Sequence, residues 1–136
     1  MLRPPDVVVL FSEEPNETPT RVWKPEARGR NREAAQHGLF LVGTGRSAFV
    51  APTLDRDGKR WRYDPVIMRP ADERARTIAA HLDSTSVLHA QDVRWEDKNG
   101  ILIIDNRKIM HGRAAVAEGD EGRKLIRMAF YLGDKS

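Results

Sequence analysis

The segment from residue 101 to residue 132 constrains the fold more than any other part of this 136-residue chain. Four consecutive apolar residues, 101–104, lead into Asp105-Asn106, which is the pattern of a strand followed by a turn. Residues 123–131 alternate between two faces if they form a second strand. Arg123 and Arg127 then share one face, roughly 13 Å apart at the usual rise of a strand.

Two arginines on one face of a strand predict a site for an anion. An unpaired charge is costly to bury, so a guanidinium group that points into a protein interior needs an anionic partner. The planar fork of arginine suits a carboxylate, which it can hold with two parallel hydrogen bonds. The same segment contains one histidine, His111, just after the first strand.

The rest of the chain predicts more short strands and one clear helix. A continuous apolar run at 7–11 is typical of a strand that is buried on both faces. Apolar residues at helical spacing predict a helix that begins after Pro70 and ends near Asp83-Ser84. The composition further predicts a loop at 13–19, strands at 21–23, 39–42, 47–50, 61–63 and within 87–95, a hairpin turn at 43–45, and a short helix or a loop around 31–36.

This order of elements predicts one domain, 1–136, that is mainly β with one or two helices. Many short strands with turn residues at short intervals favour an antiparallel sandwich or barrel. The sequence contains no cysteine, so disulfides and thiolate chemistry are excluded. No apolar run approaches the ~20 residues of a membrane span, and residues 1–11 are interpreted as a strand rather than a signal peptide. We therefore expect a cytoplasmic protein without a membrane partner.

The net charge of +3 is small, and the basic residues are scattered among acids, as in Asp55-Arg56-Asp57. This pattern is typical of a solvated surface and does not predict a nucleic-acid partner. His37 and His89 have no short-spaced partner and are interpreted as surface or turn residues. The three tryptophans are interpreted as core residues.

DNRKIMHGR, followed after a gap by RKLIR, resembles the C-terminal signature of the Fe(II)/2-oxoglutarate-dependent dioxygenases. The branch is that of taurine dioxygenase, clavaminate synthase and gamma-butyrobetaine hydroxylase. Arg62-Tyr63-Asp64-Pro65, the helix after Pro70, and Trp95 also look like landmarks of this family. The resemblance implies a double-stranded β-helix, which is a jelly-roll barrel, here incomplete and limited to its C-terminal part.

The resemblance also implies the roles of four residues. His111 would be the distal ligand of Fe(II), and Arg123 would hold the distal carboxylate of 2-oxoglutarate. Thr20, with Thr18 as the second candidate, would hydrogen-bond the same cosubstrate, although a threonine hydroxyl in this context often only satisfies a turn. Arg127 would face a small-molecule substrate.

The family's other two iron ligands, a strand-borne His-x-Asp or His-x-Glu, have no match in this sequence. The letters fit only at His81-Leu82-Asp83, which falls inside the predicted helix. Positions i and i+2 differ by about 200° around a helix, so the two side chains cannot hold one ion. Counted back from Thr20, the family's pair would precede Met1.

Three hypotheses follow. The chain is one subunit of a split oxygenase, and a second polypeptide carrying the His-x-Asp pair, or a homo-oligomer, completes the barrel. Alternatively, it is a truncated or decayed copy without turnover. In the third hypothesis it is a non-catalytic jelly-roll subunit for assembly or carboxylate binding. The joint presence of His111, Arg123 and Arg127 favours the first, with C–H oxidation of a small molecule and succinate and CO2 as coproducts.

Overall fold

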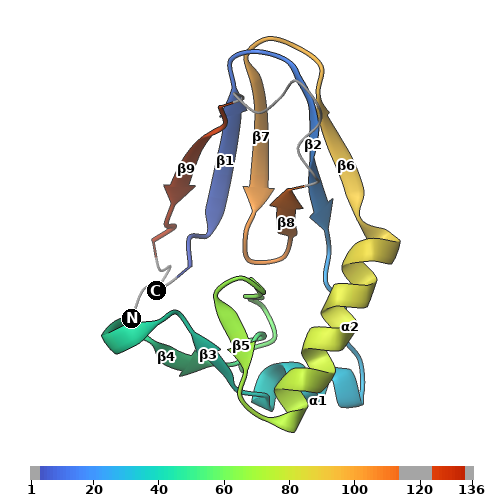
Figure 1. The fold of residues 1–136 in the computed structure, drawn as a ribbon, viewed down its shortest axis with the longest axis vertical. Helices are drawn as coiled ribbons and strands as arrows, with labels where there is room; N and C mark the ends of the chain where they lie inside the picture. The colour runs from blue at the N-terminus through green and yellow to red at the C-terminus, as the bar shows by residue number, and fades with distance from the viewer. Residues whose placement is uncertain (1–3, 114–123, 134–136) are drawn as a thin grey trace.

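The computed structural model describes residues 4–113 and 124–133, and these form a mainly β fold with two α-helices (Figure 1). None of the helices in these ranges is long and apolar enough to cross a membrane. In chain order the elements are β1 (Val7–Ser12), β2 (Asn16–Trp23), α1 (Arg30–His37), β3 (Phe40–Val42), a 3-10 turn (Gly45–Ser47), β4 (Phe49–Ala51), β5 (Met68–Pro70), α2 (Glu73–His89), β6 (Gln91–Trp95), β7 (Gly100–Asp105), β8 (Met110–Arg113) and β9 (Ile126–Phe130).

Two three-stranded antiparallel sheets form the upper part of the molecule in Figure 1. In the first sheet β1 lies between β7 and β9, and in the second β2 lies between β6 and β8. The β1–β2 and β6–β7 connections lie side by side, because the Asn99 N–H donates to the Glu13 carbonyl at 2.9 Å. Each sheet therefore combines a central strand from the start of the chain with flanking strands from its end.

The inner faces of these two sheets enclose a small apolar core. Val8 and Leu10 of β1 are buried with Ile104 of β7 and Trp95 of β6. Since Trp95 belongs to the second sheet, this cluster joins the two sheets. Leu125, just before β9, packs against the same cluster and so places the start of that strand over the core.

A second core lies below the sheets, where both helices cover the sheet β4-β3-β5. Asp72 caps α2 through its Oδ1, which accepts from the Ala75 N–H at 2.8 Å. Ile78 and Leu82 are fully buried, as the helical spacing predicted. Gly38 permits the close contact with α1, because a Cβ there would lie 2.6 Å from the Ala75 nitrogen.

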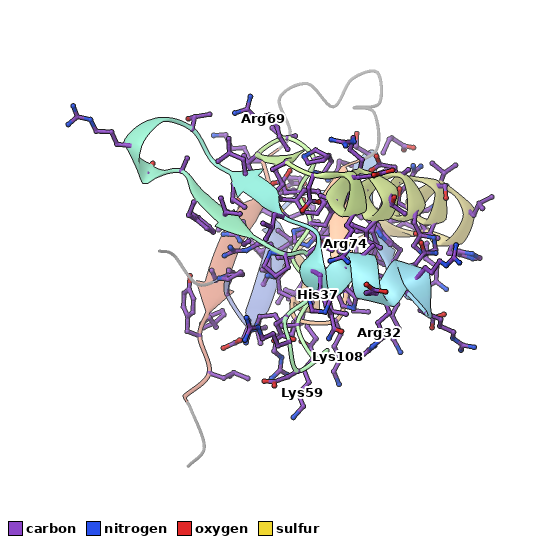
Figure 2. All side chains as sticks on the ribbon, turned by 90° about the horizontal axis from the view of Figure 1, so that it is seen from below. Arg32, His37, Lys59, Arg69, Arg74 and Lys108 are labelled. Carbon is purple, nitrogen blue, oxygen red and sulfur yellow. The ribbon has the colours of Figure 1, made fainter. Side chains whose placement is uncertain are left out.

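Positively charged side chains are exposed at the lower end, where Figure 2 looks up at α1. Arg32, Lys59 and Lys108 are all exposed there. Arg74 pairs with Glu33 at 3.3 Å, so acidic residues accompany the basic ones on this surface.

Several boundaries differ from the sequence predictions. The loop predicted at 13–19 is shorter, because β2 already begins at Asn16. Residues 61–63 form no strand, and only a single bridge links Trp61 to Leu54. Helix α2 continues past Ser84 to His89, and a short strand, β5, was not predicted. The strand at 7–11 is fully buried on one face only, since Val7, Val9 and Phe11 are half-buried.

Candidate functional site

Thr20 lies on the inner face of the second sheet and is 3% exposed. Its Oγ1 accepts a hydrogen bond from the Trp95 Nε1–H at 3.1 Å. Thr18, two residues earlier and therefore on the same face, is fully buried, and its backbone N–H donates to the Asn16 side chain at 3.1 Å. The Thr20 hydroxyl thus has a structural partner and keeps its own proton for a further acceptor.

His111 lies in β8 directly opposite Val22 of β2. Opposed residues in an antiparallel pair point to the same face, and Val22 shares its face with Thr20. The imidazole is half-buried, and its register in β8 puts it on the same face of the sheet as Thr20. Burial lowers the pKa of His111 below its ordinary value of 6.5, and the charge of Arg127 lowers it further. His111 is therefore neutral at neutral pH, which is the form that binds metals.

Arg127 comes from the opposite sheet and faces the same space. It pairs with Leu10 of β1, whose side chain is in the core between the sheets, so its side chain is on the inner face. The registers of β8 and β9 turn His111 and Arg127 toward the same space, and the charge of Arg127 lowers the pKa of the imidazole. Its side chain remains exposed and open to an anion from solvent.

Arg123 lies outside the described residues, so its role and its spacing from Arg127 stay predictions. The structure thus brings three of the four predicted site residues to one region, from β2, β8 and β9.

Asp64 is a further residue of this region, and its position in the sequence assigned it no role. Its negative charge acts on His111 and raises the pKa of the imidazole, opposing burial and Arg127. The carboxylate is held in its turn by the Val66 N–H, which donates to Oδ1 at 2.9 Å. Asp64 and His111 are far apart in sequence, and only the tertiary fold brings their charges together.

His81-Leu82-Asp83 lies inside α2, as predicted, where positions i and i+2 point to different sides of the helix. His81 donates from Nε2 to the Glu26 carbonyl at 2.8 Å. Leu82 is fully buried in the helical core. Asp83 instead accepts from the Tyr63 hydroxyl at 2.8 Å. Burial raises the pKa of Tyr63, and this hydrogen bond raises it further.

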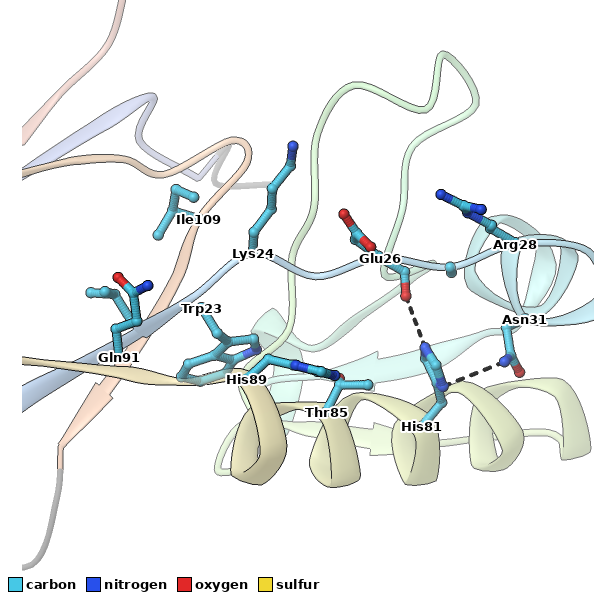
Figure 3. A pocket seen from close by; sticks show the side chains of 12 residues that line it. Trp23, Lys24, Glu26, Arg28, Asn31, His81, Thr85, His89, Gln91 and Ile109 are labelled. Carbon is cyan, nitrogen blue, oxygen red and sulfur yellow. Dashed lines mark hydrogen bonds between the residues drawn. The ribbon is translucent and has the colours of Figure 1, made fainter.

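A cavity of about 640 Å³ lies beside the lower end of β2, between the segment 24–28 and α2 (Figure 3). His81, Thr85 and His89 line one wall along α2. Trp23 lines another, and within the described part of the chain its Nε1 has no hydrogen-bond partner. Neither His111 nor Thr20 is in this lining. His81, predicted as a residue on the flank of the helix, instead bridges to the Glu26 carbonyl and Asn31.

Among residues 4–113 and 124–133, no three histidine or acidic side chains gather at one point. The described part of the chain therefore offers His111 as an imidazole donor without a complete ligand set.

No family model matches the sequence, and no curated protein matches it. Solved structures do share its fold. Asparagine oxygenase AsnO superposes with a TM-score of 0.73 at 24% identity, over 94% of this chain and 44% of that one. A complex of asparagine oxygenase with Fe(II), 3-hydroxyasparagine and succinate gives a TM-score of 0.76 at 23% identity, over 93% of this chain and 46% of that one. The non-heme iron oxygenase OrfP in complex with Fe and alpha-ketoglutaric acid gives a TM-score of 0.72 at 19% identity, over 94% of this chain and 45% of that one.

The chain spans about half the length of these solved structures. Their identities are low, so they bear on the fold. At that level the resemblance predicted from DNRKIMHGR and RKLIR is confirmed: the chain has the fold of part of the non-heme iron oxygenases AsnO and OrfP.

Proposed function

We propose that the chain is a subunit of an Fe(II)/2-oxoglutarate-dependent oxygenase that oxidises a small molecule, with succinate and CO2 as coproducts. The observation that carries the proposal is the meeting of His111, Thr20 and Arg127 between two sheets of this fold. Solved structures of the same fold hold Fe with alpha-ketoglutaric acid or succinate, which supports the same cofactors here.

In this proposal His111 is one ligand of Fe(II), and a second polypeptide supplies a histidine and a carboxylate. The neutral imidazole favours this role, because no proton has to leave before a metal binds. The bound metal would supply the oxidation chemistry, and the chain would position and shield the reactants. The two sheets then form part of a jelly-roll barrel that the partner completes.

The remaining residues would recognise anions. Arg123 would hold the distal carboxylate of 2-oxoglutarate through a bidentate contact, and the free proton of the Thr20 hydroxyl would donate to the cosubstrate. Arg127, exposed and close to His111, would orient an anionic group of the substrate. Asp64 adds a negative charge at the same place and would favour a cationic group in the substrate.

The test is succinate formation by the native complex with Fe(II) and 2-oxoglutarate. We expect His111→Ala to abolish turnover while the complex stays assembled, because one ligand is lost and the fold is kept. His37→Ala is the matched control, since His37 is exposed at the end of α1. Arg123→Ala should raise the 2-oxoglutarate requirement strongly, and an unchanged requirement would remove that residue from the site.

The second candidate is a non-catalytic subunit that binds a carboxylate or serves only in assembly. The absence of a three-ligand group among the described residues favours it. In this case His111→Ala would change neither carboxylate binding nor assembly, and no preparation would form succinate. Succinate formation by the wild type and its loss in His111→Ala therefore separate the two functions.

A further inference from the structure

The sheet β7-β1-β9 is apolar on both of its faces, although the described chain covers only one. The inner face packs against the second sheet through Val8, Leu10 and Ile104. The strand registers place a second apolar set in rows on the outer face: Ile103, Val9 and Met128; Ile101, Phe11 and Ile126; and Val7 with Phe130.

Five large side chains of this outer face are open to solvent. The exposed fractions are 64% for Ile101, 69% for Ile103, 54% for Ile126, 44% for Met128 and 48% for Phe130. At about 200 Å² for a fully exposed large side chain, they present roughly 550 Å². The largest apolar patch on an ordinary monomer is about 300–600 Å² and is often functional, and this face lies at the upper end of that range.

The chemistry of the face selects an uncharged partner surface. Among the paired positions of the described strands, Asp105 is the acidic residue on this face, beside Val7. Its charge is neutralised by Arg107, whose Nε and Nη2 donate to the carboxylate at 3.0 and 3.2 Å. The ion pair therefore forms a polar rim at one end, and the rows behind it are apolar.

The length of the solved structures points to the occupant. They share this fold, and this chain spans 44–46% of the asparagine oxygenase chains. The fold in those proteins thus includes about as many residues again, which are available to cover a sheet. A continuous apolar run such as 7–11 is typical of a strand buried on both faces, and the described chain leaves the outer face of this strand only half-buried.

We propose that the outer face of β7-β1-β9 docks the second polypeptide of the oxygenase, which covers it with the apolar face of a helix or sheet. The inference rests on the proposed function and adds the surface that the partner uses. A standard interface buries about 800 Å² per partner, and the five exposed side chains alone present roughly two thirds of that area.

The test compares two double variants of the full chain, tagged and expressed in its own source. Ile103→Lys with Met128→Lys places two charges on the outer face. Val87→Lys with Leu88→Lys is the matched control, because these apolar residues of α2 are 75% and 74% exposed and lie away from the sheet. Native mass spectrometry should find an equimolar polypeptide on the wild type and the control, and at least about tenfold less on the outer-face variant.

The unmodified complex gives a second readout that does not depend on the variants folding. Met128 should be oxidised by hydroxyl radicals in the free chain and protected in the complex. The docking surface is supported if the outer-face variant loses the partner and if Met128 is protected in the unmodified complex. A chain without a partner, a second copy in its place, equal binding to both variants, or an unprotected Met128 would each overturn it. A partner lost as expected but lacking a His-x-Asp or His-x-Glu strand would support the surface and refute the split oxygenase.

Discussion

Thr20→Val tests how far the hydroxyl of Thr20 serves the fold, and its cost follows from the structure. Valine keeps the shape of threonine and removes the acceptor for the Trp95 Nε1–H, which now bonds at 3.1 Å. Both residues are 3% exposed, so water cannot replace the lost partner. An orphaned buried donor costs about 1–3 kcal/mol. For a domain of this size, that lowers Tm by roughly 3–5 °C per kcal/mol.

Urea unfolding followed by tryptophan fluorescence and by circular dichroism measures this loss. Thr20→Ser is the control, because it keeps the acceptor and should retain most of the stability. In a Trp95→Phe background the donor is absent, so Thr20→Val should then cost less than about 0.5 kcal/mol. A Thr20→Val protein as stable as the wild type would refute the account, and the hydroxyl would be left with its cosubstrate role alone.

Three further predictions concern the ends of the chain, the site and the long helix. Asp6→Ala should cost about 3–5 kcal/mol, because the buried carboxylate accepts from Arg60 and from the Leu132 N–H, and urea unfolding checks it. His111→Gln should make the unfolding free energy fall less as the pH is lowered. In the wild type the unfolded chain takes up a proton below pH 6.5, while the folded imidazole, whose pKa is lowered, does not, so acid favours the unfolded state. Unfolding free energies at about pH 7.5 and about pH 5 measure that difference, and equal slopes for both proteins would contradict it. Asp72→Ala should cost about 1–2 kcal/mol in thermal unfolding, since it removes the cap of α2 and a bond to the Leu39 N–H, whereas Asp72→Asn, whose single side-chain oxygen can keep the cap alone, should cost less.

The sequence predicted elements whose patterns are local and missed those that tertiary contacts decide. The loop at 13–19 was predicted from its proline, asparagine and threonine content, and β2 nevertheless includes Pro19, which cannot donate in a ladder. It is tolerated in β2 because the register with β6 shifts between Asn16 and Thr20. The end of α2 was placed too early because Ser84, Thr85 and Ser86 favour turns. Their hydroxyls instead bond carbonyls three residues earlier and let the helix continue.

The site was predicted from a short motif, and its assembly was not. His111 and Arg127 were named from the sequence, but their meeting depends on β2 and β1 pairing with distant strands. Asp64 was noted in the sequence only as part of the landmark Arg62-Tyr63-Asp64-Pro65, because its effect on His111 comes from a charge that only the tertiary fold brings near the imidazole. Residues 61–63 failed as a strand because their N–H groups bond two separate segments, at Arg107 and Thr53, rather than one neighbour.

The placement of β1 and β2 at the centres of their sheets has a consequence for synthesis. Val8 pairs with Ile104 and Ala129, and the Leu132 N–H reaches an acceptor 126 positions earlier. Both central strands therefore leave the ribosome long before any strand that can pair with them. Folds dominated by such distant pairs form slowly and expose unpaired edges meanwhile. We expect the apolar run 7–11 to be a chaperone-dependent segment until the last strands emerge.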